Sequence, residues 1–340
     1  MASGLIVAAL MGSGVVGRVA SPWIASSPIA KPAPHTAGGP APVMELPPRR
    51  PYSPPAPAPR GAVPLPAPVL ASPAASTPAP TPAFAGLAGR LRQYVASRPG
   101  EVSVAIYDAV TGRTVMVNDP TTSGWEMAST VKLSIAVALL ARAGAGAQLS
   151  AGQHRLALQM ISVSDNAAAS QLWSSLGGAP AMGRFFARLG MTSTVPDPAN
   201  QWGLTLTTAA DQLAVLRAAA YPNPVLGGAG RIALDELLHT VIPGQRWGVP
   251  NGVPPGVAVE VKNGWLPYGG GWIIDSLGHV HGAGQDYVMA VYTRRNPSMQ
   301  AGIDTVTGLS RLVWKALTSG SAPGPRPGSA QPSRLALPAP

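Results

Sequence analysis

The sequence lacks cysteine, and its core lacks any apolar run long enough to cross a membrane. The first absence excludes disulfide scaffolds, thiolate metal sites, thiol nucleophiles and lipid attachment through an N-terminal cysteine. The second excludes a polytopic membrane protein, because a spanning helix needs about 20 consecutive apolar residues. Charged residues are also scarce, at 11% of the chain.

The basic residues are spread thinly along the chain. The formal net charge of +10 is divided between the central region and both flanks, and the most prominent basic pairs are Arg49-Arg50 and Arg294-Arg295. Nucleic-acid-binding proteins usually gather basic residues on one face, often with aromatic residues between them. No nucleic-acid partner is therefore expected.

Proline divides the chain into three parts. Of the 39 prolines, 20 lie in residues 1–83 and 6 in residues 319–340, which leaves an ordinary density between them. We predict one folded domain over residues 84–318, followed by a disordered Pro/Gly/Ser tail. The first part divides again, into a signal peptide or short anchor (1–27) and a disordered Pro/Ala-rich spacer (28–83). We therefore expect export to an extracellular, periplasmic or cell-wall location, with the N-terminal segment able to associate with a membrane or cell wall.

Hydrophobic periodicity places strands at both ends of the domain and helices in the middle. The predicted strands are 101–108, 113–118, 257–262, 271–277 and 286–294, and the predicted helices are 84–97, 129–142, 151–162, 167–176, 179–189, 208–220, 231–241 and 303–317. This order predicts an α+β fold. A five-stranded antiparallel sheet would draw strands from both ends of the chain, with terminal helices on one face and an all-helical lobe on the other.

Ser129 and Lys132 begin one of the most apolar predicted helices. Their spacing of three residues puts both side chains on the same face, one turn apart. A serine hydroxyl becomes a good nucleophile only when a base takes its proton, and burial can lower the pKa of a lysine enough for it to be that base. The alternative, an N-capping serine beside a lysine that reaches the surface, remains open for this pair alone.

Two further motifs follow in order, Ser164-Asp165-Asn166 within helical sequence and Lys262-Asn263-Gly264 at the end of a predicted strand. Together with Ser129-Thr130-Val131-Lys132, they resemble the S-x-x-K, S-D-N and K-T-G motifs of the serine beta-lactamase and penicillin-binding protein superfamily. The chain looks nearest to the class A-like branch. The resemblance extends over much of the predicted domain and implies the beta-lactamase/transpeptidase-like fold.

The resemblance implies a role for each matched residue. Ser129 would be the acylated nucleophile, Lys132 its general base, and Ser164 the group that relays a proton to the leaving nitrogen, while Asp165 would be structural. The other matched residues would bind a beta-lactam or a peptidoglycan-peptide-like substrate: Asn166, Lys262, Asn263, Gly264 and Trp265. The backbone amides of Ser129 and Trp265 would form the oxyanion hole. No cofactor is implied, and the chain is expected to be a monomer.

The sequence also departs from the class A pattern. Between Met191 and Leu213, where class A enzymes carry a glutamate that activates the deacylating water, this chain has only Asp197 and Asp211 as acidic residues. Asp211 fits a helix cap with Thr208, and Asp197 lies between two prolines in a loop. We therefore expect slow deacylation. Asn263 also replaces the usual Thr or Ser, which weakens recognition of a substrate carboxylate.

Two other groups of residues have structural explanations. Glu126 lies three residues before Ser129, where a carboxylate is ordinarily explained by the helix dipole. His279 and His281 share one face of a predicted hairpin at a spacing typical of metal ligands. Because no acidic residue or cysteine adjoins these histidines in the sequence, no metal site is predicted.

The sequence thus predicts an exported serine hydrolase that forms an acyl-enzyme with beta-lactams or D-Ala-D-Ala-type peptides and deacylates slowly. The alternative is a non-catalytic cell-wall binding or scaffolding module that retains the fold. The presence of all five polar motif residues, Ser129, Lys132, Ser164, Asn166 and Lys262, argues for the enzyme, because unpaired buried polar groups cost stability.

Overall fold

The computed structural model describes residues 86–118 and 124–319. The predicted signal segment, the Pro/Ala-rich spacer and the tail beyond residue 319 lie outside the described residues. Within the described ranges, no helix combines the length and the apolar character that crossing a membrane requires.

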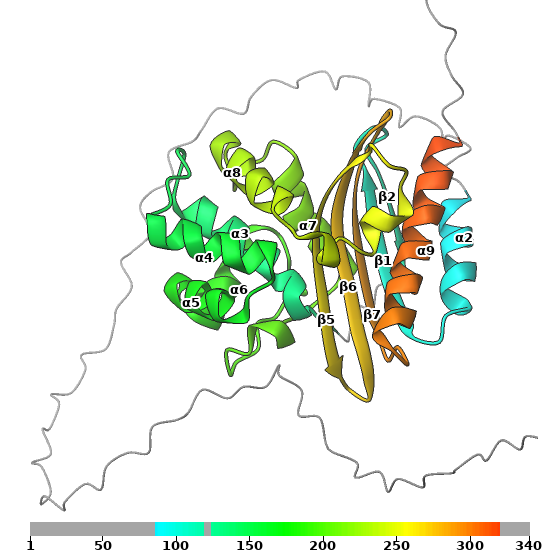
Figure 1. The fold of residues 1–340 in the computed structure, drawn as a ribbon, viewed down its shortest axis with the longest axis horizontal. Helices are drawn as coiled ribbons and strands as arrows, with labels where there is room; N and C mark the ends of the chain where they lie inside the picture. The colour runs from blue at the N-terminus through cyan, green and yellow to red at the C-terminus, as the bar shows by residue number, and fades with distance from the viewer. Residues whose placement is uncertain (1–85, 119–123, 320–340) are drawn as a thin grey trace, which may run out of the picture. The chain divides into compact units, whose positions relative to one another are not determined.

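A five-stranded antiparallel sheet forms the centre of the fold, as predicted (Figure 1). Its strands are β1 (Glu101–Asp108), β2 (Arg113–Val117), β5 (Ala258–Tyr268), β6 (Gly271–Gly282) and β7 (Gln285–Arg294). They lie in the order β2-β1-β7-β6-β5, so that β1 pairs with β7 and joins the two ends of the described domain. All five neighbouring residues from Val102 to Ile106 are buried because helices cover both faces of the sheet.

Two terminal helices cover one face of this sheet (Figure 1). They are α2 (Leu87–Ala96) and α9 (Met299–Thr318). Helix α2 buries Leu87, Leu91 and Val95, which recur every four residues and form one apolar stripe. The Tyr94 hydroxyl of α2 donates a hydrogen bond to the Asp304 carbonyl of α9, 3.3 Å away, so the first and last described helices support each other.

A helical lobe lies on the other face. Its helices are α3 (Val131–Arg142), α4 (Ala151–Ser162), α5 (Asn166–Leu176), α6 (Gly178–Arg188), α7 (Ala209–Ala220) and α8 (Gly228–His239). Side-chain caps fix three of their starts: Ser150 forms a capping box at α4, Asp165 caps α5 and Thr208 caps α7. These boundaries agree with the predicted helices to within about three residues.

The structure differs from the sequence prediction at two places that matter for the site. A second, two-stranded sheet pairs β3 (Trp125–Glu126) with β4 (Leu206–Thr207), and neither strand was predicted. In addition, β5 does not end at Lys262 but continues to Tyr268. Lys262-Asn263-Gly264 therefore lies in the middle of a strand and is held on one side by its ladder with β6.

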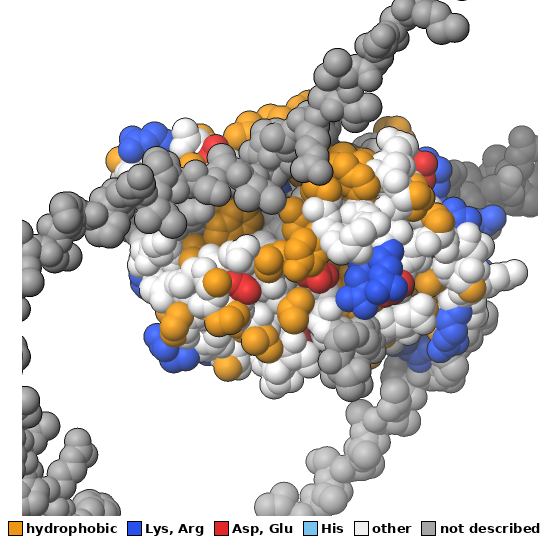
Figure 2. All heavy atoms as spheres, turned by 90° about the horizontal axis from the view of Figure 1, so that it is seen from below, with side chains coloured by type: hydrophobic (Ala, Val, Ile, Leu, Met, Phe, Trp, Pro, Cys, Tyr) orange, Lys and Arg blue, Asp and Glu red, His pale blue; other side chains and the backbone are white. Residues whose placement is uncertain are grey.

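The basic residues show no continuous strip on the face drawn in Figure 2, where Lys and Arg side chains form separate small groups. Of the two pairs noted in the sequence, Arg294-Arg295 falls within the described residues. Both of its side chains form ion pairs with Glu101, at 2.7 and 2.8 Å.

Candidate active site

Ser129 lies in a single 3-10 turn, η1 (Ala128–Thr130), directly before α3. Helix α3 is buried along its length from Val131 to Leu140, so the residues at its start have little freedom to move. Ala128 has a left-handed φ of 44°, a conformation that costs about 1–3 kcal/mol in a non-glycine residue and is characteristic of functional sites. The Thr130 hydroxyl lies 2.9 Å from that of Tyr292 in β7 and ties this turn to the sheet.

Lys132 is fully buried and points into a polar pocket between α3 and the start of α5. Its Nζ lies 2.5 Å from the Ser164 carbonyl oxygen, 2.7 Å from Asn166 Oδ1 and 3.0 Å from Ser164 Oγ. The structure therefore brings the first two motifs together. Among the described residues, the Ser129 hydroxyl forms no hydrogen bond, and Lys132 is bonded to Ser164 and Asn166 instead.

Ser164 is positioned by the junction between α4 and α5. It has a left-handed φ of 58° and is 5% exposed. The Asp165 side chain accepts a hydrogen bond from Ala168 N at 2.6 Å and so caps α5, which is the structural role expected of it. This cap fixes the turn that directs Ser164 and Asn166 toward Lys132.

Lys262 joins the same group from the sheet. It is 1% exposed. Its Nζ lies 3.1 Å from Ser164 Oγ and 2.9 Å from the carbonyl oxygen of the next residue, Asn263. The Ser164 hydroxyl thus contacts the ammonium or amine groups of both buried lysines. A hydroxyl donates one proton and accepts others, so Ser164 can pass a proton between these groups.

Burial changes the acid-base behaviour of both lysines. It lowers the pKa of Lys132 to about 6, with a further lowering from the charge of Lys262 and a partial opposing effect of Asp165. Burial alone lowers the pKa of Lys262 to about 7. At neutral pH Lys132 is therefore mainly a neutral amine, which has a lone pair and can take a proton.

Gly264 allows β5 to approach the backbone of the serine turn. A Cβ atom placed on Gly264 would lie 2.9 Å from both Ser129 N and Thr130 N, and 3.0 Å from the Met127 carbonyl oxygen. A real side chain does not tolerate such contacts with backbone atoms. The third motif therefore packs directly against the first.

Comparisons with known proteins identify the family and the fold of this chain. The sequence model of the beta-lactamase enzyme family matches residues 153–317 of this chain. The putative lipoprotein LppW of Mycobacterium tuberculosis (strain ATCC 25618 / H37Rv) is 32% identical over 262 residues, which cover 72% of this chain and 80% of LppW. The chain belongs to the beta-lactamase/transpeptidase-like superfamily.

Solved structures of the superfamily share the fold. An ancestral class A beta-lactamase matches with a TM-score of 0.59 at 25% identity, covering 68% of this chain and 99% of that one. PBP-A matches with a TM-score of 0.60 at 21% identity, covering 69% and 97%. A variant of PBP-A that matches similarly, at a TM-score of 0.61, was solved as an acyl-enzyme complex with penicillin G.

Asn263 departs from this beta-lactamase-like pattern in the structure as well as in the sequence. Its side chain is 1% exposed, and its Nδ2 donates to the carbonyl oxygens of Gln245 and Trp247 at 2.8 and 2.9 Å. These bonds use the Nδ2 group of this buried side chain to hold the segment before β5, whereas its Oδ1 has no hydrogen-bond partner among the described residues. Trp265 follows in β5 and packs edge to face on Trp247, with ring centroids 6.0 Å apart.

Asp197 in the loop before α7 and Asp211 in the first turn of α7 both hold that loop through hydrogen bonds. Asp197 Oδ1 accepts hydrogen bonds from Ala199 N and Gln201 N at 3.0 and 3.1 Å. Asp211 Oδ2 accepts from Ser193 N and from the Thr194 hydroxyl at 2.9 and 2.7 Å. Neither bonds to Ser129 or Lys132, so neither stands in for the glutamate of class A enzymes.

Trp202 is a member of the site that the sequence analysis missed. It begins the turn η2 (Trp202–Leu204), and its ring centroid lies 5.0 Å from Lys132 Nζ, within the range of a cation-π contact. Its Nε1 donates to Ser170 Oγ at 3.0 Å, which fixes the ring. No spacing in the sequence connects this loop tryptophan with Lys132, because the loop folds back over α5.

Of the residues given structural explanations, Glu126 lies in β3 and pairs with Leu206 of β4. No hydrogen bond or ion pair joins Glu126 to Ser129 or Lys132 in the described part of the chain. The fold also places beside His279 and His281 an acidic residue that does not adjoin them in the sequence. Glu260 of β5 lies opposite His279 of β6 and contacts both rings.

Proposed function

We propose that the chain is a serine acyl-transfer hydrolase that acts on beta-lactams or D-Ala-D-Ala-type peptides and releases the acyl group slowly. The observation that carries this proposal is Lys132, a fully buried lysine with a pKa of about 6, held by Ser164 and Asn166 two residues after the serine turn. Burial of a lysine costs stability, and a lowered pKa is typical of a catalytic base.

The first half-reaction follows from these positions. Ser129 Oγ attacks the substrate carbonyl carbon while its proton passes to the neutral amine of Lys132. The oxygen of the tetrahedral intermediate is stabilised by the backbone amides of Ser129 and Trp265. The C–N bond then breaks, its electron pair stays on nitrogen, and Ser164 delivers to that nitrogen a proton drawn from Lys132. The product is an ester of Ser129.

The second half-reaction needs water to attack this ester, and a base to accept the proton of that water. The carboxylates of Asp197 in the loop before α7 and of Asp211 in the first turn of α7 are both engaged in hydrogen bonds within the protein. The Trp202 ring lies next to Lys132 and is apolar apart from its N–H, which is already bonded. The absence of a free carboxylate in this loop supports slow hydrolysis of the acyl-enzyme.

Intact-mass spectrometry of the full chain during incubation with a penicillin tests this proposal. We expect one covalent adduct per chain that persists after the free drug is removed, and no adduct with Ser129→Ala. An adduct that disappears quickly as hydrolysed drug accumulates would contradict slow deacylation and indicate an efficient beta-lactamase. An adduct that also forms on Ser129→Ala would show that Ser129 is not the nucleophile.

Acylation should depend on pH through Lys132. The reactive form of Lys132 is the neutral amine, so the rate rises as pH increases through about 6 and levels off above it. Well below pH 6 the rate should fall about tenfold per pH unit, because each unit removes nine-tenths of the remaining base. Acylation rates from quenched mass spectra between pH 5 and pH 8 measure this. A profile that still rises steeply above pH 9 would rule out a lysine with a lowered pKa as the base.

A second candidate function is a non-catalytic cell-wall binding or scaffolding module. Two observations favour it. Asn263 Nδ2 already donates hydrogen bonds within the protein, and the Ser129 hydroxyl has no hydrogen-bond partner in the described residues. In the mass experiment this function predicts that no adduct forms with any penicillin, cephalosporin or activated D-Ala ester. Binding of peptidoglycan fragments without turnover would then support it.

The place of action we propose is the cell envelope. The relative LppW is named a putative lipoprotein, which supports export of this chain as well. This sequence contains no cysteine to carry a lipid, so any attachment would use its N-terminal segment in another way. Fractionation of cells that express the full chain tests this location, and recovery only from the cytoplasm would refute it.

A further inference from the structure

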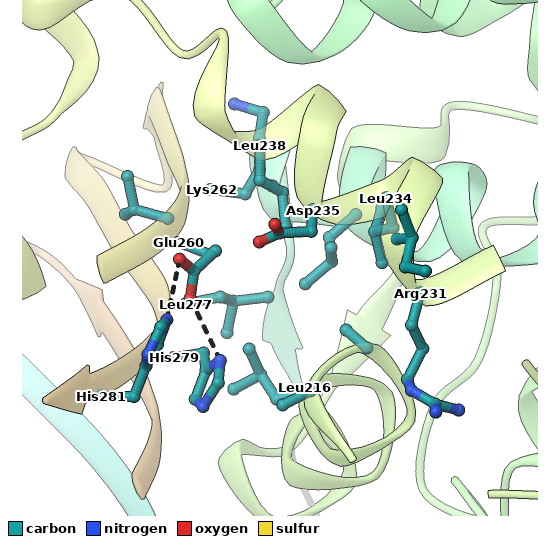
Figure 3. Close-up of a pocket in the computed structure, with 15 residues that line it drawn as sticks. Leu216, Arg231, Leu234, Asp235, Leu238, Glu260, Lys262, Leu277, His279 and His281 are labelled. Atoms are coloured by element: carbon teal, nitrogen blue, oxygen red, sulfur yellow. Dashed lines mark hydrogen bonds and ion pairs between the residues drawn. The ribbon is translucent and has the colours of Figure 1, made fainter. Parts of the chain in front are cut away.

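A second cluster of ionisable side chains lies on β5 and β6, outside the proposed catalytic group. Glu260 is 7% exposed and lies directly opposite His279 in the strand ladder, and His281 follows on the same face (Figure 3). The two imidazole rings are stacked, with centroids 4.7 Å apart. Neither the proposed acylation nor the packing of the sheet requires two histidines around a buried carboxylate here.

The distances within this cluster match the spacing of ligands around a small ion. His279 Nδ1 lies 3.1 Å from Glu260 Oε2, and His281 Nε2 lies 3.1 Å from Glu260 Oε1. One ligand atom from each of the three residues falls within 4.8 Å of the others. Bonds of about 2.0–2.1 Å in a tetrahedral zinc site put neighbouring ligand atoms about 3.3 Å apart. A small closure of the three side chains would therefore enclose one ion.

His279 is also held in the orientation that a ligand needs. Its Nε2 lies 3.0 Å from Asp286 Oδ1, which accepts a further hydrogen bond from the Tyr221 hydroxyl at 2.8 Å. With Nε2–H donated to Asp286, the lone pair of the neutral ring is on Nδ1, the atom that faces Glu260. A histidine that binds a metal almost always donates its other N–H to a carboxylate or carbonyl in this way.

Helix α8 provides further ligands from the other side of Glu260. Asp235 and His239 offer ligand atoms that lie with one of Glu260 inside the same 4.8 Å limit. Figure 3 shows the Asp235 carboxylate turned toward that of Glu260. Two carboxylates this close repel each other, and a cation between them relieves the repulsion. Asp235, Glu260, His279 and His281 also line one cavity of about 300 Å³, and the side chain of His281 is 44% exposed, which leaves an entry path.

The geometry points to a Zn²⁺ site in which Glu260, His279 and His281 are the protein ligands, while Asp235 of α8 belongs to a separate group with His239 and Glu260. Imidazole and carboxylate ligands together suit zinc better than calcium or magnesium, which prefer oxygen ligands alone. The ion would hold β5 and β6 together. Lys262 of the proposed catalytic group lines the same cavity, but the test of the zinc site does not depend on enzyme activity.

Isothermal titration of metal-freed full chain with Zn²⁺ tests the site. We expect one ion bound per chain. Asp286→Asn should weaken binding about 10–100-fold, the usual effect of losing the carboxylate behind a histidine ligand. Glu260→Gln and His281→Ala, which remove ligands, should weaken it further. His154→Ala is the matched control, because His154 of α4 lines a different cavity, and its affinity should equal that of the unchanged protein.

The variants also separate loss of the site from loss of the fold. Glu260 is buried, so Glu260→Gln could fail to fold, whereas His281 is half-exposed and His281→Ala should keep the melting temperature of the metal-free protein. Absence of saturable Zn²⁺ binding would overturn the proposal and leave the cluster as an ion-pair network. Binding that survives both Glu260→Gln and His281→Ala, or that is lost equally in His154→Ala, would place the ion elsewhere and also overturn it.

Discussion

Replacement of Lys132 by methionine is expected to slow acylation of Ser129 by about 10²–10⁴-fold, the usual contribution of a general base. Methionine has nearly the length of lysine and fills the same buried space, but it has no lone pair that can take the serine proton. The acylation rate is measured from the growth of the penicillin adduct in intact-mass spectra.

The effect of Lys132→Met on stability has two opposing parts. Removing a buried amine removes its desolvation cost, whereas the Ser164 carbonyl and Asn166 Oδ1 each lose a donor, at about 1–3 kcal/mol for each group left unpaired. A melting curve must therefore accompany the rate. Lys315→Met, on the exposed side of α9, is the control and should acylate normally. A folded Lys132→Met protein that acylates as fast as this control would exclude Lys132 as the base.

The fold could be predicted from the sequence because the alternation of apolar and polar residues is strong at both ends of the domain. The strands Glu101–Asp108 and Gln285–Arg294 are bounded by turn residues, and the two pair along their full length in the centre of the sheet. The helices of the lobe begin at recognisable caps such as Ser150 and Thr208. The two-residue strands of the small sheet have no such pattern, because two pairs of facing residues are too few to show a periodicity.

The site was only partly predictable. Helical spacing alone places Ser129 near Lys132, but their relation to Ser164 and Lys262 came from the resemblance of three motifs to a known superfamily. Nothing in the sequence around Lys132 shows that its amine bonds to Ser164 and Asn166 and not to Ser129. That choice depends on how α5 begins, and hence on the left-handed turn at Ser164.

The histidine cluster was missed because two strand boundaries were predicted too early: β5 continues beyond Lys262, and β6 continues beyond Leu277 to include both histidines. The sequence prediction ended a strand at Lys262, because Asn263, Gly264 and Pro267 are poor strand residues. The structure continues to Tyr268, since β5 is an edge strand and an edge can hold a proline whose missing N–H faces away from the ladder. Only the complete ladder, which turns after Tyr268, brings Glu260 opposite His279.

Replacement of Gly264 by alanine is expected to slow acylation by about 10²–10³-fold, the effect of losing one oxyanion donor. The added Cβ would lie 2.9 Å from Ser129 N, and the neighbouring atoms are backbone, so they cannot rotate away. The serine turn must then move, which displaces both the nucleophile and the amide that would stabilise the tetrahedral oxygen. Overpacking of this kind also costs about 1–3 kcal/mol of stability.

Gly89→Ala is the matched control for this substitution. Gly89 lies on the exposed side of α2, and a Cβ there meets no atom within 4 Å. Alanine in a helix interior is more favourable than glycine by about 0.5–1 kcal/mol, so this control should melt slightly higher and acylate normally. If Gly264→Ala acylated at the rate of Gly89→Ala while remaining folded, the backbone contact between β5 and the serine turn would have no part in positioning Ser129. The oxyanion role of the Ser129 amide would then have to be abandoned with it.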